Sequence, residues 1–220
     1  MCGSSICYCL GMSTTELGLR ERKKQRTREQ IADTAWQLFA ERGFDQVTVA
    51  EIAADAEVSE ATVFNYFPSK EDLVFHRMEA FEQELLAAIR NRPEGETIVA
   101  AFGRFALRPR GFLASDDPRA REGMRAAARI ITGSHALLSR EREIFERFTG
   151  TLAALIAEER GMAPNDLEAW VAANALIGLH RALIDYTHRQ ALAGVENRRI
   201  ARNLRRHGGR ALALLEHGLG

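Results

Sequence analysis

The feature that most constrains this chain is residues 48–70, which read TVAEIAADAEVSEATVFNYFPSK and hold two short helix patterns joined by a three-residue turn. Thr48 is followed three residues later by Glu51. This is capping-box spacing, in which each side chain binds the backbone N–H of the other residue. The spacing predicts a first helix over about residues 49–56.

A second start signal follows directly after the turn. Ser59 can cap a helix over about residues 60–67, and Pro68 ends it, because proline disfavours helical geometry in the residue before it. Ser69 and Asp72 form a third capping pair that opens the next helix. Two short helices around a tight turn form a helix-turn-helix, which lays its second helix in the DNA major groove.

Overall charge does not point to nucleic acid, but its distribution does. Lys+Arg and Asp+Glu both number 30, so the net charge is zero. Residues 20–28 (RERKKQRTR) nevertheless hold six basic residues and one acid, whereas residues 29–75 are acidic. We expect the basic segment, including Arg28, to contact phosphates, since neutralising phosphates drives non-specific affinity. The alternative is a solvated, frayed N-terminus.

The three cysteines, Cys2, Cys7 and Cys9, all lie in the first nine residues. No disulfide framework can hold the fold, so we expect a cytoplasmic protein. Their spacing is a poor match to zinc sites, and the segment lacks the pattern of a signal peptide. Met12 resembles an ordinary start, so residues 1–11 are interpreted as a start-site artefact or disordered extension, with redox sensing by the cysteines as the alternative.

Helical periodicity runs throughout the chain, and no strand signal survives. The sequence therefore predicts an all-α fold with nine helices, three in a DNA-binding head and six in a C-terminal body. Thr27 is expected to cap the first helix, which ends at Gly43. No window of about 18 apolar residues occurs, so no membrane partner is expected. The predicted domains are a disordered tail (1–22), a helix-turn-helix domain (23–69) and a ligand-binding and dimerisation domain (70–220).

Six body helices are predicted from apolar spacing and from breaks at Gly and Pro. Asn165 followed by Glu168 is interpreted as the cap of the fifth. Their expected ranges are about 70–91, 98–107, 118–133, 135–160, 166–192 and 196–215.

The last two helices are expected to form a homodimer interface. The 166–192 helix has two apolar stripes, one containing Leu176 and the other Ile177, and a helix with two apolar faces needs two partners. Gly208 and Gly209 lie in the middle of the final helix and indicate close backbone approach or a kink. The alternative is that both helices bury more of the monomer's own core.

Residues 31–73 resemble the tetracycline-repressor (TetR) family of transcriptional regulators. The resemblance is carried by the apolar pattern of the first helix and by a set of pairs: Gly43-Phe44, Val47-Thr48, Ile52-Ala53, Val58-Ser59, Tyr66-Phe67 and Ser69-Lys70. It implies a homodimeric regulator, usually a repressor, that is released from a palindromic double-stranded DNA operator by a small-molecule effector in its C-terminal domain. The effector and operator are not identified by the sequence.

The resemblance also implies roles for individual residues. Thr48, Tyr66 and Lys70 would bind phosphates, which fixes register without reading sequence. Exposed side chains of the second motif helix would face base edges, with Asn65 able to pair with adenine and Thr62 to bond a base or meet a thymine methyl. The expected DNA-binding residues are Arg28, Thr48, Glu60, Ala61, Thr62, Phe64, Asn65, Tyr66 and Lys70.

Two positions depart from the family pattern. Phe64 stands where the family commonly has Tyr, so a phenolic hydrogen bond is lost, and Phe64 either touches a thymine methyl or packs inward. Glu57 stands where Gly is common in the turn. A non-glycine residue with positive φ costs about 1–2 kcal/mol there.

Large side chains on the body helices are expected to line an effector pocket, because such sites are mostly apolar with a few polar anchors. Asn174 and Arg181 share a helical face with Trp170 and Ile177, and a buried Asn174 amide would need a partner. The expected ligand-binding residues are Phe102, Phe105, Met124, Phe145, Phe148, Trp170, Asn174, Ile177 and Arg181. The effector would bind the form whose heads cannot fit adjacent major grooves.

Enzymatic signatures are missing from the sequence. No nucleophile elbow, metalloprotease motif or phosphate-cradling glycine loop occurs, so an enzyme is not expected. No cofactor is expected, and His135, His180 and His188 are too scattered to indicate a metal. A regulator without a small effector, responding to a protein partner, is the remaining alternative.

Overall fold

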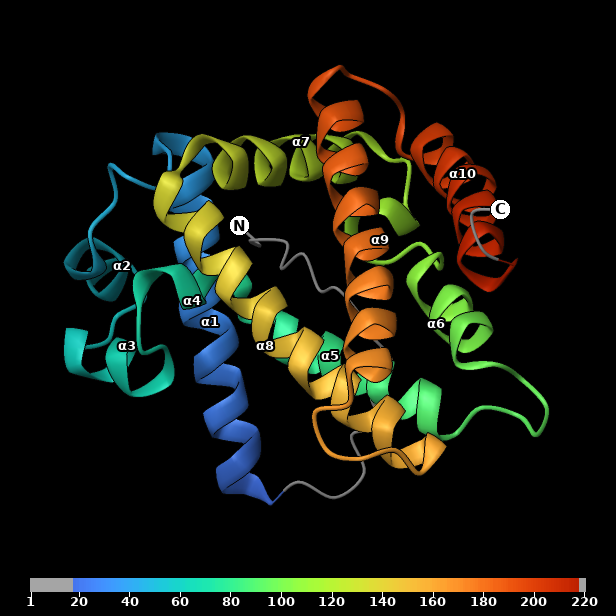
Figure 1. Ribbon diagram of the computed structural model, residues 1–220. Helices are drawn as coiled ribbons and strands as arrows, with labels where there is room; N and C mark the ends of the chain where they lie inside the picture. Colours follow the sequence, from blue (N-terminus) through green and yellow to red (C-terminus); the bar gives the residue numbers. More distant parts are fainter. Residues whose placement is uncertain (1–17, 218–220) are drawn as a thin grey trace.

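The computed structural model describes residues 18–217, and this part of the chain is helical throughout, as the sequence predicts (Figure 1). None of its helices is long and apolar enough to cross a membrane. In chain order the elements are α1 (Leu19–Arg42), α2 (Val49–Asp55), α3 (Glu60–Tyr66), α4 (Lys70–Phe75), α5 (Met78–Arg90), α6 (Ile98–Ala106), the 3-10 helix η1 (Gly111–Ala114), α7 (Pro118–Gly133), α8 (His135–Arg160), α9 (Leu167–Leu192) and α10 (Asn197–His217).

The predicted caps of the head are confirmed. Thr48 and Glu51 form a reciprocal capping box on α2, and Ser69 and Asp72 form another on α4. Ser59 Oγ accepts the N–H of Thr62 at the start of α3. These caps fix where each short helix starts.

The core of the head extends beyond the first three helices. Buried side chains of α1, α2 and α3 pack with Leu73, Val74 and Phe75 of α4. The same cluster includes Ile130 of α7, and Leu137 and Ile144 of α8. A three-helix unit of this size is marginal alone, and here it shares its core with the corner between α7 and α8.

Two helix starts differ from those predicted. α1 begins at Leu19, so residues 19–22 are helical and Thr27 is an interior residue whose hydroxyl bonds the Lys23 carbonyl. The charged residues there are good helix formers, which accounts for the longer helix. The prediction missed them because it began the helix at the Thr27 cap. α9 is capped by Asp166, whose carboxylate accepts two N–H groups, and the Asn165 cap is therefore wrong. Asn165 instead has φ +62°.

The single helix predicted over about residues 70–91 is two helices, α4 and α5, with a break at His76 and Arg77. The described part of the chain thus has ten α-helices rather than nine. The ring of His76 bonds the Leu73 carbonyl at 2.9 Å, a side-chain bond that competes with continuation of the helix. The break lets α4 face the head core while Leu85 and Ile89 of α5 face the core of the body.

The body has a main core between α5, α6, α8 and α9, and a smaller cluster between α7, α9 and α10. Both apolar stripes of α9 are at least half-buried within this one chain, so they do not in themselves require a second protomer. A Cβ at Gly208 would meet Leu107 and Leu183, so the close approach predicted for the paired glycines is confirmed at this position, within the monomer. α10 continues through both glycines without interruption.

The turn between α2 and α3 closes through a specific pair of backbone bonds. The N–H of Glu57 bonds the Ala54 carbonyl and that of Val58 bonds the Ala53 carbonyl, which is the Schellman pattern. This pattern needs a left-handed residue, and Glu57 has φ +56°. The same pair of bonds occurs at Gly161 and Gly194, where glycine adopts the conformation without strain.

Replacing Glu57 by Gly is therefore expected to stabilise the protein. The left-handed penalty of about 1–2 kcal/mol is relieved, and the greater chain entropy of unfolded Gly offsets about 0.5–1 kcal/mol of that gain. Thermal unfolding should show a Tm higher by up to about 6 °C for a chain of this size. The matched control, Ala54→Gly in the exposed interior of α2, should lower the Tm; a Glu57→Gly protein with a lower Tm would contradict the strain.

Candidate nucleic-acid interface

The exposed face of α3 consists of neighbouring positions on one side of the helix. Val63 is buried against the head core, and Thr62 and Tyr66 are half-buried. The spacing i, i+1, i+4 and i+5 places the remaining side chains on the opposite face, in solvent. These exposed residues are Glu60, Ala61, Phe64 and Asn65.

Phe64 points outward, with 49% of its surface exposed. The prediction left two alternatives for this residue, and the inward-packing one is wrong. Val63, which precedes it, and Phe67, about one turn later, are each 1% exposed and fill the core beneath α3. A large apolar side chain held in water on a short capped helix is suited to contact with a thymine methyl.

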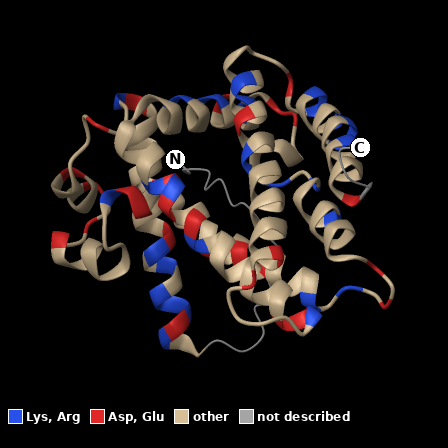
Figure 2. Ribbon diagram, viewed as in Figure 1, with Lys and Arg blue, Asp and Glu red and all other residues tan. Residues whose placement is uncertain are grey.

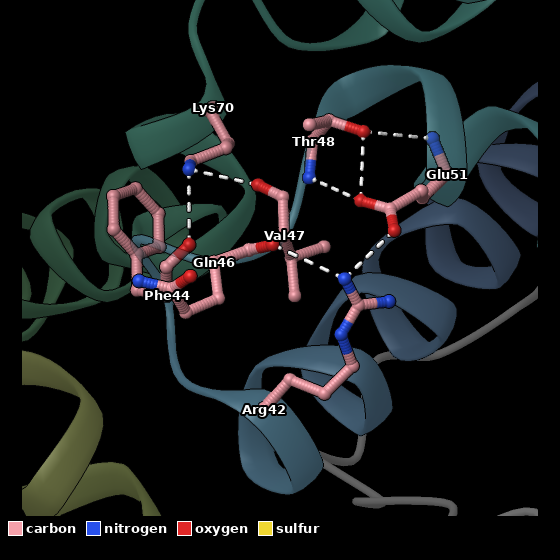
Figure 3. A network of polar contacts seen from close by, with 7 residues as sticks. All are labelled: Arg42, Phe44, Gln46, Val47, Thr48, Glu51 and Lys70. Carbon is pink, nitrogen blue, oxygen red and sulfur yellow. Dashed lines mark hydrogen bonds and ion pairs between the residues drawn. The ribbon is translucent and has the colours of Figure 1, made fainter.

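The hydroxyl groups of Thr62 and Thr48 already form hydrogen bonds within the head. The hydroxyl of Thr62 shares a 2.8 Å hydrogen bond with Ser59 Oγ. The amide and hydroxyl of Thr48 both donate to Glu51 Oε2 at 2.8 Å (Figure 3). A phosphate contact by Thr48 would compete with this capping box.

Glu51 is the centre of the network in Figure 3. Arg42 of α1 binds its other carboxylate oxygen at 2.7 Å and also donates to the Gln46 carbonyl. The hydrogen bond from the Thr48 amide, followed by the bond from Arg42, holds the pKa of Glu51 at about 2. The network ties the end of α1 to the start of α2 across the loop between them.

Lys70, a predicted phosphate ligand, is half-buried at the start of α4. Its ammonium donates to the carbonyls of Phe44 and Val47, each at 2.9 Å, and lies 4.1 Å from the centre of the Phe44 ring (Figure 3). An ammonium has three donors, so one N–H is left for another acceptor. Lys70 thus fastens the α1–α2 loop to α4 in the free protein.

Positive charge on the head comes from α1. Residues 20–28, which hold six basic residues, form the first turns of this helix instead of a frayed arm (Figure 2). Arg28 is half-buried, with its guanidinium 5.2 Å from the centre of the Phe67 ring. By contrast, residues 43–69 contain five acidic residues and no Lys or Arg. Residues 43–69, which include α2 and α3, therefore offer no basic side chain to phosphates.

The structure brings most of the predicted ligand-binding residues into one cluster in the body. Phe102, Phe105, Phe145, Phe148 and Ile177 share the main core, with Trp170 partly buried against it. Met124 lies in the separate cluster of α7, α9 and α10.

Two polar residues of the predicted ligand-binding set, Asn174 and Arg181, are exposed. Asn174 is exposed and donates to the carbonyl of Trp170 one turn earlier, so the expected buried amide is wrong. The inward face of α9 is set by Ala173, Leu176 and His180 rather than by position 174. Arg181 is exposed, with its guanidinium 5.8 Å from the centre of the Phe145 ring.

Three residues in the same region were missed by the sequence reasoning. Phe81, Arg110 and His180 come from three different elements and meet at the edge of the main core. His180 continues the apolar stripe of Leu176 and Ile177 at helical spacing, and this was the available signal. Among the described residues no group of His, Cys, Asp and Glu suited to a metal ion occurs. Cys2, Cys7 and Cys9 lie outside the described residues.

Two surface hollows accompany the body core. One, of about 490 Å³, lies between α6 and α10 and is lined by apolar side chains with Arg104, Arg108 and Arg205. The other, of about 270 Å³, lies beside Trp170 near the end of α8. Of the predicted ligand-binding residues, Trp170 alone lines either hollow.

Comparison with known proteins connects the head to a family of regulators. Residues 31–76 match the model of the bacterial regulatory proteins of the tetR family. The HTH-type transcriptional regulator TcmR of Streptomyces glaucescens is 32% identical over 151 residues, which cover 68% of this chain and 67% of TcmR. The nucleoid occlusion factor SlmA of Pasteurella multocida is 31% identical over 124 residues, 56% of this chain and 58% of SlmA. The match thus spans about two thirds of the first relative and less of the second.

Solved structures share the fold over nearly the whole chain. A TetR-family regulator from Syntrophomonas wolfei superposes with a TM-score of 0.57 at 16% identity, covering 90% of this chain and 98% of that one. FadR from Bacillus subtilis, solved in complex with stearoyl-CoA, has a TM-score of 0.55 at 20% identity, covering 87% and 99%. At these identities the likeness concerns the fold alone.

Acid titration provides a test of the Glu51 network. Because the folded pKa is lowered from 4.5 to about 2, the stabilisation is present above about pH 4.5 and is lost as the pH falls toward 2. We expect the carboxyl carbon of Glu51 to titrate near pH 2 by NMR. Arg42→Gln should raise this pKa only partly, since the Thr48 amide bond is its first cause; a wild-type midpoint near 4.5 would contradict the network.

Proposed function

Because this chain belongs to the tetR family of bacterial regulatory proteins, and is a DNA-binding transcriptional regulator, we propose that it is a homodimeric repressor. The repressor binds a palindromic operator and is released by a small-molecule effector in the body. The observation that carries the proposal is the exposed face of α3, whose outward side chains stand on a helix capped and held by the head core.

The side chains of α3 can discriminate bases by ordinary chemistry. The Asn65 amide can bond both N6 and N7 of adenine, and Phe64 offers an apolar surface to a thymine methyl. Ala61 is small enough to let the helix approach the groove floor. Glu60 accepts hydrogen bonds only, which favours a cytosine amino group. An A·T-rich half-site with a cytosine at one flank suits this face.

Affinity must come from elsewhere, because residues 43–69 are acidic. The basic first turns of α1 supply the phosphate contacts in this proposal, together with the remaining donor of Lys70. Phosphate contacts position a protein on the duplex, and base contacts select the site. The two tasks are thus divided between α1 and α3.

The homodimer is proposed to form through α9 and α10. The apolar stripes of α9 mostly face the interior of this chain. The proposal is therefore supported by large apolar side chains that remain exposed on the same two helices. These are Leu167 (76% exposed), Val171 (61%), Leu192 (43%), Leu214 (54%) and Leu215 (37%). The effector role rests on the aromatic body core, and FadR, which shares the fold, was solved in complex with stearoyl-CoA.

Selection from a random DNA pool tests the function directly. Enrichment of an inverted repeat, with half-sites about one helical turn or a multiple apart, is the expected result. Equilibrium sedimentation at the same protein concentrations should show a dimer. If only weak, sequence-blind binding with a steep salt dependence appeared, the head would contact phosphates without reading bases, and the operator proposal would fail.

Asn65→Ala is expected to weaken operator binding by a factor of about 5–150, the range of 1–3 kcal/mol for one bidentate base contact. The loss should be confined to operators with adenine at one position of each half-site, and repeating the selection should show that position relaxed. Asn91→Ala, at the exposed end of α5, is the matched control. Equal loss for all sequences would contradict base reading by Asn65.

Lys23→Gln is expected to weaken binding to operator and random DNA alike and to reduce the slope of log K against log salt by about 1. Affinity measured by fluorescence anisotropy at several salt concentrations gives this slope. Arg206→Gln, on an exposed part of α10, removes the same charge from the body. If both variants changed the slope equally, the α1 segment would have no special role.

A further inference from the structure

His180 of α9 is buried among aromatic rings and lacks a hydrogen-bond partner on one ring nitrogen. The residue is 7% exposed, and its Nδ1 is buried without a partner. The ring of Phe81 stacks on the imidazole with centres 5.0 Å apart, while Phe145 and Phe102 approach edge-on at 5.9 and 6.5 Å. Leaving a buried polar atom unpaired costs stability, so such an atom needs an explanation.

The imidazole is neutral in this setting. Burial, and second the charge of Arg110, lower the pKa of His180 to about 4. A neutral imidazole offers one donor nitrogen and one acceptor nitrogen, and the tautomer decides which is which. The unpaired Nδ1 can therefore bond either a hydroxyl proton or a hydroxyl oxygen.

Arg110, in the loop before η1, provides a second unmatched group beside the same rings. Its guanidinium lies 3.6 Å from the centre of the Phe105 ring and 5.7 Å from that of Phe81. It donates to the Phe105 carbonyl, but within residues 18–217 it forms no ion pair. Glu84 is the acid whose field acts on it, at longer range. A half-buried guanidinium thus lacks a contacting anion.

The ring of Phe81 fills the space between these two groups. It stacks on His180, meets the Phe105 ring at 5.3 Å and lies beneath the guanidinium of Arg110. Phe81 itself is only half-buried, near the start of α5. One hydrocarbon ring is therefore in contact with both polar groups and can form a hydrogen bond with neither.

We propose that the Phe81 ring is a placeholder for the effector, and that the effector is a planar aromatic acid carrying a hydroxyl group. Its ring would take the place of Phe81 beside the imidazole, turned so that its hydroxyl meets Nδ1 in the plane of the imidazole, and its anionic group would pair with Arg110. An acyl chain would leave Nδ1 unpaired. The identity of this site as the effector site rests on the function proposed above.

The position of Phe81 also connects the site to the head. Phe81 lies in the first turn of α5, directly after the break at His76 and Arg77 that separates α5 from α4. α4 in turn packs in the head core and is separated from α3 by three residues. Displacing the Phe81 ring moves the start of α5, and the break transmits this to α4.

Binding of three probes by isothermal titration calorimetry tests the site. 3-Hydroxy-2-naphthoate has the ring, the hydroxyl and the acid, 2-naphthoate lacks the hydroxyl, and decanoate has only a chain and an acid. We expect hydroxynaphthoate to bind about tenfold more tightly than naphthoate, as for one hydrogen bond to a buried group, and decanoate to bind most weakly. Equal affinity for all three would overturn the proposed ligand class.

Variants assign the contacts. His180→Leu should raise the Tm, because the orphaned nitrogen is gone, while hydroxynaphthoate loses its advantage over naphthoate. Arg110→Gln should weaken both aromatic acids. Phe81→Ala should strengthen them about tenfold, since the ligand no longer has to displace a ring. Arg104→Gln, on the other side of α6 and lining the 490 Å³ hollow, is the matched control and should change nothing; if it abolished binding, the site would be that hollow.

Release of the selected operator by hydroxynaphthoate tests the connection to the head. If the operator binds but no probe binds either wild type or Phe81→Ala, the inference fails while DNA recognition stands. If no operator is found, the proposed function fails, and a loss of hydroxynaphthoate preference in His180→Leu would still establish the site. Probe binding without operator release would confirm the ligand class and overturn the displacement of α5 as the signal.

Discussion

The carboxylate of Asp72 joins the DNA-reading head to the body. One oxygen accepts the amide and hydroxyl of Ser69, which caps α4 directly after the reading helix, and the other accepts two N–H groups of Arg140 on α8 at 2.8 and 3.0 Å. Ser134, between α7 and α8, adds a 2.9 Å bond to Asp45 in the head. With the shared apolar core, these bonds make the orientation of α3 depend on the α7–α8 corner. A movement in the body can therefore reach the DNA-reading face without any flexible linker.

The division of charge in the head has a consequence for specificity. The reading helix and its neighbours are acidic, and basic residues are concentrated in the first turns of α1. Non-specific binding depends on phosphate neutralisation, so an acidic reading surface penalises contact with DNA that does not offer matching base edges. Such a head gives up affinity on random DNA and keeps discrimination, which is the arrangement that a regulator searching a genome needs.

Local chemistry explains which parts of the structure were predictable. The caps at Thr48, Ser59 and Ser69 depend on residues three positions apart, so the sequence alone located α2, α3 and the start of α4. The break at His76 accompanies a bond between its ring and the Leu73 carbonyl, which the apolar spacing used for the prediction does not reveal. The burial of His180 depends on which distant helices pack alongside, and no local pattern encodes that. Asn174 failed for the same reason: helical spacing defines which residues share a face, but only packing decides which face turns inward. The roles of individual residues toward DNA and effector remain predictions.

Two positions in the structure break local rules, and they differ in kind. Glu57 occupies a left-handed Schellman position that glycine fills at Gly161 and Gly194, and no contact of its side chain in the described structure compensates for the strain. His180 leaves a buried nitrogen unpaired, yet it does so beside a guanidinium without a contacting anion and beside the half-buried ring of Phe81. Isolated violations reduce stability, whereas violations that converge on one place indicate a site shaped for something else. By that criterion the aromatic cluster around His180, rather than the turn at Glu57, is the place in this fold for which we propose a ligand.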